Sequence, residues 1–206
     1  MRTWTLLPAL LAASALLVGC SDTETGEATP AATESSPTNS SPSENGTAPG
    51  GAPKVENPLD TTKFQQDPCN TLTSAQLQEL VLDEPGEPDD AEAGPNCIWR
   101  NSEAQSRASI VFVTAGNHGI SDVYANRDTN PVFEELPAIE GHPVVAYDAV
   151  EGEHEKGYCT LAVGATDQLW LSIGVKISDA TVGQRDPCVA AQGVAEMMIN
   201  TMQGGS

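Results

Sequence analysis

Basic residues are scarce in this 206-residue chain. It has 9 Lys and Arg against 29 Asp and Glu, so its formal net charge is −20 at pH 7. The acids are not confined to one end, because residues 60–206 hold 23 acids and 7 bases, a net charge of −16. A negative field of this size repels nucleic acids and anionic lipid headgroups. The composition therefore argues against a nucleic-acid-binding protein.

Motifs for catalysis and metal binding are also missing. The chain has no Gly-x-Ser-x-Gly, His-Glu-x-x-His or Cys-x-x-Cys sequence. Its histidines, His118, His142 and His154, fall in loops or turns, where a side chain is usually solvated. The acidic segment 151–155 lacks the residue order of a calcium loop, and a second acidic cluster at 89–92 is expected to be unstructured. We expect no catalytic residue, no cofactor and no metal.

Long apolar runs are limited to one near the N terminus. Residues 4–18 carry no charge, and this run is shorter than the roughly 20 residues of a membrane span. It ends at Leu17-Val18-Gly19-Cys20, where small or aliphatic residues precede a cysteine, as lipid attachment and cleavage require. We interpret residues 1–19 as a lipoprotein signal peptide. An uncleaved single-pass anchor is the alternative.

Cys20 is the predicted lipidation site. A diacylglycerol on its sulfur, with a further acyl chain such as palmitate on the new N terminus, would anchor the protein durably to the outer face of the plasma membrane. The segment that follows is rich in Ser, Thr, Pro and Gly, with Val55 as its only large aliphatic residue. Such a composition cannot offset the entropy of ordering, so we expect residues 20–58 to form a disordered tether. A signalling tail is the alternative.

Four further cysteines lie in the expected domain, residues 59–206. An even number in an exported chain indicates two disulfides. Four cysteines allow three pairings, and the sequence does not select among them. We favour the local scheme, Cys69 with Cys97 and Cys159 with Cys188, which closes loops of similar span.

Periodicity predicts one α+β domain with a largely antiparallel sheet and flanking helices, expected to be a monomer. One helix is expected after Thr73, a candidate N-cap with Gln76 three residues on. Another is expected after Asp186, with Pro187 in its first turn, and the aspartates of both Asp-Pro-Cys sequences are expected to cap helices. A short helix is predicted at 120–126. Strands are predicted at 98–99, 107–114, 143–149, 158–165 and 168–177, the last two joined by a hairpin.

Three motifs carry a family resemblance. Asp67-Pro68-Cys69-Asn70-Thr71-Leu72-Thr73 opens the domain, Cys97-Ile98-Trp99 follows, and Asp186-Pro187-Cys188 comes near the end. Together they resemble the actinobacterial lipoproteins grouped as domain of unknown function 3558. The resemblance implies an exported, lipid-anchored protein, and it supplies no catalytic residues.

The sequence thus predicts a membrane-anchored extracytoplasmic lipoprotein with a non-enzymatic role, binding an unknown ligand or protein of the cell envelope. Two alternatives stay open. One is an envelope hydrolase or wall-modifying enzyme that uses a loop histidine with carboxylates, and the other is a structural surface protein without a ligand. Trp99, Trp170 and Tyr158 are candidate pocket residues, although we expect both tryptophans in the core.

Overall fold

The computed structural model describes residues 49–148 and 150–205, all within one compact unit that spans Pro42–Ser206. The predicted signal peptide, Cys20 and the tether up to residue 48 lie outside the described residues. In the part that is described, no helix combines the length and the apolar character needed to cross a bilayer.

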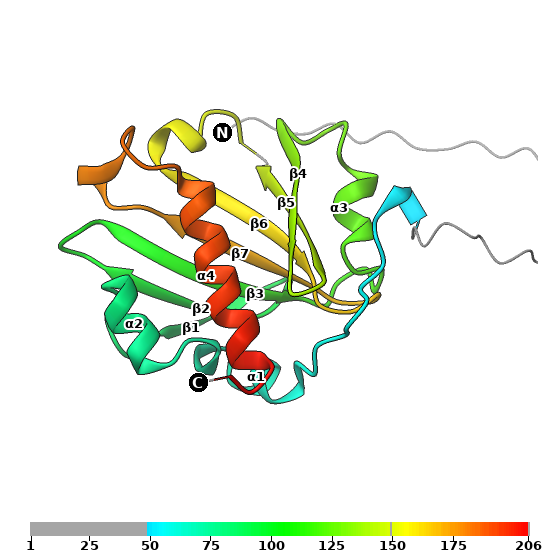
Figure 1. The fold of residues 1–206 in the computed structure, drawn as a ribbon, viewed down its shortest axis with the longest axis horizontal. Helices are drawn as coiled ribbons and strands as arrows, with labels where there is room; N and C mark the ends of the chain where they lie inside the picture. Colours follow the sequence, from blue (N-terminus) through cyan, green and yellow to red (C-terminus); the bar gives the residue numbers. More distant parts are fainter. Residues whose placement is uncertain (1–48, 149, 206) are drawn as a thin grey trace, which may run out of the picture. The chain divides into compact units, whose positions relative to one another are not determined.

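In the described part of the chain, seven antiparallel strands form one sheet in the order β1-β2-β3-β7-β6-β5-β4 (Figure 1). Consecutive strands pair as neighbours, so β1 to β3 form one meander and β4 to β7 another, and the two meet where β3 pairs with β7. The predicted α+β class and the predicted β6–β7 hairpin are confirmed. The strands are β1 (Glu87–Ala91), β2 (Gly94–Asn101), β3 (Ser106–Val113), β4 (Val132–Ile139), β5 (His142–Asp148), β6 (Tyr158–Gly164) and β7 (Trp170–Lys176).

One face of the sheet is covered by helix α4 (Pro187–Met202), which packs on β6 and β7 (Figure 1). Alternate strand residues point to the same face, so β6 and β7 present continuous apolar rows to the helix. Burial of each large apolar side chain contributes about 1.5–3 kcal/mol, and this interface is the main core. Trp99 lies in it, as predicted. The residues that α4 contributes to this core are Ala191, Val194, Ala195, Met198, Ile199 and Met202, and those they face include Leu161, Val163, Leu171, Ile173 and Val175.

Two short helices precede the sheet and belong to the same core. They are α1 (Thr62–Gln66), which buries Phe64, and α2 (Ser74–Leu80), which buries Leu77. The sequence predicts the start of α2 correctly. Gln76 N–H donates to Thr73 Oγ1, and Thr73 N–H donates to Gln76 Oε1, which is a complete capping box.

The opposite face of the sheet has a smaller apolar cluster toward one end. Helix α3 (Ser121–Ala125) packs there, and Tyr124 meets Phe133 edge-on with ring centroids 5.2 Å apart. Burial raises the pKa of Tyr124 to about 12, and the charge of Glu135 adds to the rise. Toward the other end of this face the sheet carries two exposed bases, Arg100 and Arg107. The strand residues of the apolar cluster are Val113, Val145, Ala162 and Trp170, so the second tryptophan is also in a core, as predicted.

Residues 49–59 pack on the sheet before the first α-helix. Ala52 and Val55 are buried. The Val55 N–H donates to Asp167 Oδ1 at 3.2 Å, and the Leu59 N–H donates to Ala165 O at 2.9 Å. Composition assigns residues 49–58 to the tether, but their few apolar side chains find partners at the β6–β7 turn and on the sheet. The packed domain therefore extends upstream of Leu59.

The two edge strands, β1 and β4, are not predicted by the sequence. The acidic residues expected to be unstructured at 89–92 begin within β1, which pairs with β2 from Glu87 opposite Ile98 to Ala91 opposite Gly94. β1 contains Pro88, and β4 contains Pro137 where its register on β5 shifts. Charge and proline suit an edge strand because they discourage pairing with another chain, and the same residues obscure the strand pattern.

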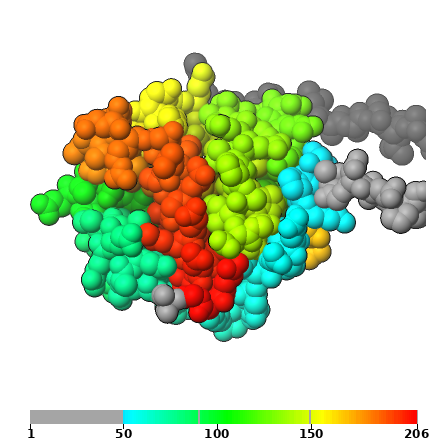
Figure 2. All heavy atoms as spheres, in the orientation of Figure 1, coloured from blue at the N-terminus to red at the C-terminus, as the bar shows by residue number. Residues whose placement is uncertain are grey.

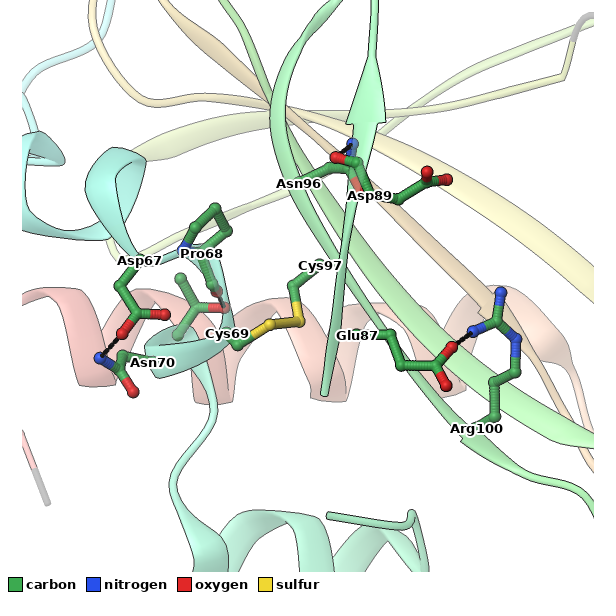
Figure 3. The surroundings of a disulfide bond; sticks show 10 residues. Asp67, Pro68, Cys69, Asn70, Glu87, Asp89, Asn96, Cys97 and Arg100 are labelled. Atoms are coloured by element: carbon green, nitrogen blue, oxygen red, sulfur yellow. Dashed lines mark hydrogen bonds and ion pairs between the residues drawn. A yellow bond between two sulfur atoms is a disulfide. The ribbon is translucent and has the colours of Figure 1, made fainter. Parts of the chain in front are cut away.

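Two disulfides tie the Asp-Pro-Cys segments to the sheet. Cys69 bonds to Cys97 on β2 (Figure 3), and Cys188 bonds to Cys159 on β6, so the favoured pairing is confirmed. In each bridge the strand cysteine is buried and its partner is half-buried. The bridges therefore join the start of a helical segment to the core side of a strand.

Candidate ligand-binding cleft

The histidines differ in environment. His118 is exposed and pairs with Asp122 at 3.0 Å. His142 is fully buried, so the solvated turn expected for it is wrong: its Nδ1 lies 2.8 Å from Gly164 O, and its Nε2 has no partner within the described residues. The reason is strand alternation, because His142 begins β5 and shares the face of Val144.

The third histidine, His154, is part of the acidic segment 151–155 and is half exposed. Burial raises the pKa of Asp148, and a hydrogen bond with Thr160 partly offsets that rise. No hydrogen bond or ion pair joins a histidine to a buried acid within residues 49–148 and 150–205. Glu153 is engaged by Lys156 at 2.8 Å. The two histidine–carboxylate pairs among the described residues, His118 with Asp122 and His154 with Asp186, both lie at the surface.

One grouping of possible metal ligands occurs among the described residues, at the start of α4. His154, Asp186 and Cys188 have potential ligand atoms within 4.8 Å of one another. However, the sulfur of Cys188 is bonded to Cys159, and Asp186 Oδ1 accepts hydrogen bonds from the N–H groups of Cys188 and Val189. The bond from Cys188 N–H is the main reason that the pKa of Asp186 lies below its ordinary value. The grouping is a helix cap beside a disulfide.

An apolar cleft with a volume of about 550 Å³ opens beside α4. Its walls are the end of α2, the start of β3, the end of β7, the segment between β7 and α4, and the part of α4 from Val189 to Met197. Figure 2 shows a recess there, with green residues set back between α2, the orange segment that precedes α4, and α4 itself. Ligand sites commonly have volumes of about 300–1,000 Å³ and mainly apolar walls, so this cleft is the candidate site. Its apolar lining includes Val81, Leu82, Val175, Ile177, Val189 and Met197.

Two valines in the lining of this cleft face solvent. Val81 is 63% exposed and Val189 is 65% exposed. Val150 is the third large apolar side chain of comparable exposure in the described part, and it lies outside the cleft. Single exposed apolar residues are common, but two at the rim of one apolar cleft extend its apolar surface to the solvent.

Val81 also has a strained backbone. It occupies the left-handed region, with φ 54° and ψ 48°, directly after α2. The Leu82 N–H donates to Leu77 O and the Val81 N–H to Gln78 O, which is the Schellman ending that normally places glycine at this position. Asn101 Nδ2 also holds the Val81 carbonyl at 2.9 Å. The left-handed conformation costs an ordinary residue about 1–2 kcal/mol, so the valine is kept here at the expense of stability.

A family comparison covers most of this structure. The sequence profile of a family described as Protein of unknown function (DUF3558) matches residues 15–201. The chain belongs to DUF3558. The family membership predicted from the sequence motifs is therefore confirmed. A comparison with curated proteins gave no match.

The cleft of this DUF3558 protein also gathers positive charge. Of the seven bases in residues 60–206, Arg107, Lys176 and Arg185 line it, together with one acid, Glu79. Lys176 is paired with Asp179, whereas neither Arg107 nor Arg185 forms an ion pair with any described residue. Sequence reasoning did not find this site, because the residues come from four separate segments. The sequence shows only that bases are scarce. The fold shows that three of these few bases lie together in the lining of one cleft.

Proposed function

We propose that this protein is an extracytoplasmic lipoprotein of an actinobacterial cell envelope, anchored through lipid on Cys20, whose domain binds an apolar ligand without catalysing a reaction. The anchor is supported by the apolar run that ends at Leu17-Val18-Gly19-Cys20. The binding role is supported by the cleft, and the observation that carries it is Val81. A solvent-facing valine in a conformation suited to glycine lowers the stability of the fold. It also supplies apolar surface that an apolar ligand can cover.

The shape of the cleft favours an extended chain as ligand. It runs between a helix and the ends of two strands, and its apolar residues come from three sides. A single alkyl chain in this cleft would cover both exposed valines at its rim. Each methylene that it buries contributes about 0.8 kcal/mol, so a long chain binds without any hydrogen bond.

The anchor is tested by labelling cells that express the full chain with a palmitate analogue. We expect label on the wild-type protein and none on Cys20→Ser, which has no thiol to accept the lipid. Globomycin, which blocks signal cleavage of lipoproteins, should leave a longer precursor. Soluble, unlabelled wild-type protein would refute the anchor and leave the binding proposal standing.

Ligand binding is tested with the full chain held in phosphatidylcholine nanodiscs. The probe is a long-chain alcohol with a photoreactive group, and intact-protein mass spectrometry measures the labelled fraction at each probe concentration. We expect adducts in the peptides that contain Val81 and Val189. Val189→Ala should raise the half-labelling concentration by about fivefold, or ~1 kcal/mol, because it removes part of the apolar wall.

Val150→Ala is the matched control, since Val150 is equally solvent-facing and outside the cleft. It should leave labelling unchanged. A second variant, Val81→Gly, separates binding from folding: it should raise the free energy of unfolding by about 1 kcal/mol while weakening labelling. Equal labelling of Val189→Ala, Val150→Ala and wild type, or labels outside the cleft, would count against the proposal.

A further inference from the structure

Three basic side chains occupy adjacent positions across the sheet. Arg100 on β2 lies opposite Arg107 on β3, and Arg107 lies opposite Lys176 on β7. Tyr158 on β6 lies opposite Lys176 and completes the row. Directly paired residues share a face, and here it is the face opposite α4. We call these four residues the cationic row.

Placing like charges opposite one another in a sheet is destabilising. Two of the three charges are partly neutralised, since Arg100 pairs with Glu87 (Figure 3) and Lys176 with Asp179. Arg107 pairs with no acid among the described residues, and its guanidinium lies 5.4 Å from the centroid of the Tyr158 ring. An acidic domain with seven bases has therefore placed three of them side by side. Because no described acid pairs with Arg107, an anion bound there would relieve this repulsion.

The cationic row has space for such an anion. It borders a hollow with a volume of about 190 Å³, whose other walls come from the turn between β2 and β3. That hollow and the apolar cleft share three lining residues, Ser106, Arg107 and Lys176. These residues stand at the start of β3 and the end of β7, so a ligand in the apolar cleft can reach Arg107 and Lys176 directly.

We propose that the ligand of the cleft is a single-chain amphiphile with an anionic headgroup, phosphate or carboxylate, which the cationic row binds while the alkyl chain fills the cleft. This inference rests on the proposed function. Arg107 is the principal contact, because a guanidinium fork matches the oxygens of either anion with two parallel hydrogen bonds. Ser106 lies beside it in the lining of both cavities and offers a further donor.

The strongly negative charge of the domain does not conflict with an anionic ligand. Exposed charges are screened beyond about 10 Å at moderate salt. A headgroup in contact with the cationic row is therefore attracted mainly by these nearby bases. The negative charge of the rest of the domain slows the approach of an anion but weakens its bound state little. A small anion without an alkyl chain buries no apolar surface and therefore binds weakly. The site selects molecules that have both an anionic headgroup and an alkyl chain.

The experiment compares three photoreactive probes of equal chain length on the full chain in phosphatidylcholine nanodiscs: an alkyl phosphate, a fatty acid and the neutral alcohol. We expect the two anions to reach half-labelling at about tenfold lower concentration than the alcohol, the effect of a hydrogen bond to a charged group. Arg107→Gln should remove most of this preference, and Arg107→Lys should keep part of it. A preference for one anion alone would assign the headgroup to phosphate or to carboxylate.

Arg127→Gln is the matched control, because Arg127 is an exposed base that lines neither cavity. Since each probe enters the nanodisc to its own extent, the decisive comparison is between the two glutamine variants with the same probe. The melting temperature should be nearly unchanged in Arg107→Gln, since reduced repulsion offsets the lost contact with Tyr158. Equal labelling by anions and alcohol, or a preference that survives Arg107→Gln, overturns the inference and leaves the proposed function intact. Failure of all three probes to label the cleft overturns both.

Discussion

The tripeptide Asp-Pro-Cys occurs twice in the domain, and its two copies have different structures. After Asp186 the chain forms the 16-residue helix α4, whereas after Asp67 it forms the 3₁₀ turn η2 (Pro68–Thr71). Both copies place proline in the first turn, and both bridge their cysteine to a strand. The difference arises after the cysteine, where Val-Ala-Ala-Gln continues a helix and Asn-Thr-Leu-Thr ends one.

The aspartates differ in the same way. Asp186 accepts hydrogen bonds from two backbone N–H groups, at 2.7 and 3.4 Å, and so caps α4 as predicted. The carboxylate of Asp67 accepts no bond from a backbone N–H group of the described residues, and instead accepts one from Asn70 Nδ2 at 2.7 Å (Figure 3). The expectation that Asp67 is a side-chain cap is therefore wrong. Asn70 and Thr71 suit turns, and the helix restarts at a new cap, Thr73. A local motif sets the start of a segment, and the residues after it decide how far the helix extends.

The largest expected effect is shared by both copies. Replacing Cys69 and Cys97 together by alanine, or Cys159 and Cys188 together, should lower the free energy of unfolding by about 3–4 kcal/mol in the loop-entropy model. The sequence separations are 28 and 29, so the two losses should agree within about 1 kcal/mol. Urea denaturation of the two double variants gives both values. A much larger loss for one pair would mean that packing around the bridge, rather than chain entropy, dominates.

A smaller effect should separate the copies. Asp186→Ala is expected to cost about 1 kcal/mol, because two N–H groups at the start of α4 lose their acceptor. Asp67→Ala removes one exposed hydrogen bond and should cost at most a few tenths of a kcal/mol. Both variants keep the disulfides, so thermal and urea unfolding report the loss of the aspartate contacts alone. Equal losses would contradict the assignment of capping to Asp186 only.

The smallest effect concerns the charge of Asp186. Its pKa is lowered in the folded protein, mainly by the hydrogen bond from Cys188 N–H, so ionisation stabilises the fold at pH values above the unfolded pKa, about 3.9. The contribution is lost as the pH falls through the folded pKa. Asp186→Asn keeps a capping oxygen without the charge. It should therefore be less stable than wild type by a few tenths of a kcal/mol at pH 6, since an exposed carboxylate is screened, and equal to it near pH 2. If the stability difference between Asp186→Asn and wild type persists near pH 2, the difference arises from the geometry of the capping hydrogen bonds and not from the charge of Asp186.

Local signals predicted the parts of this fold that depend on neighbouring residues. The capping box at Thr73, the cap at Asp186 and the alternation from Leu169 to Ile177 all lie within short segments, and the structure confirms them. The edge strands were missed because β1 carries acids and proline, and β4 carries Pro137. Burial of His142 was missed because its surroundings come from other strands.

The candidate site depends on distant residues throughout. The cationic row joins Arg100, Arg107, Lys176 and Tyr158, which become neighbours only through the pairing of four strands. The strain at Val81 depends on the turn geometry after α2 and on the hydrogen bond from Asn101. No short sequence pattern marks either feature. Register and strand order decide which side chains meet, and both are fixed by tertiary structure.

The strand order has a consequence for how quickly the chain finds its structure. Among the described residues, five of the six strand pairings join strands that are consecutive in sequence, and the pairing of β3 with β7 alone joins distant ones. Each disulfide lies within one half, Cys69–Cys97 with the first meander and Cys159–Cys188 with the second. Neither cross-link shortens the loop that must close to bring β3 beside β7, and closing long loops is what slows folding. The two halves should therefore form early, and their docking should set the folding rate whether the cysteines are oxidised or reduced.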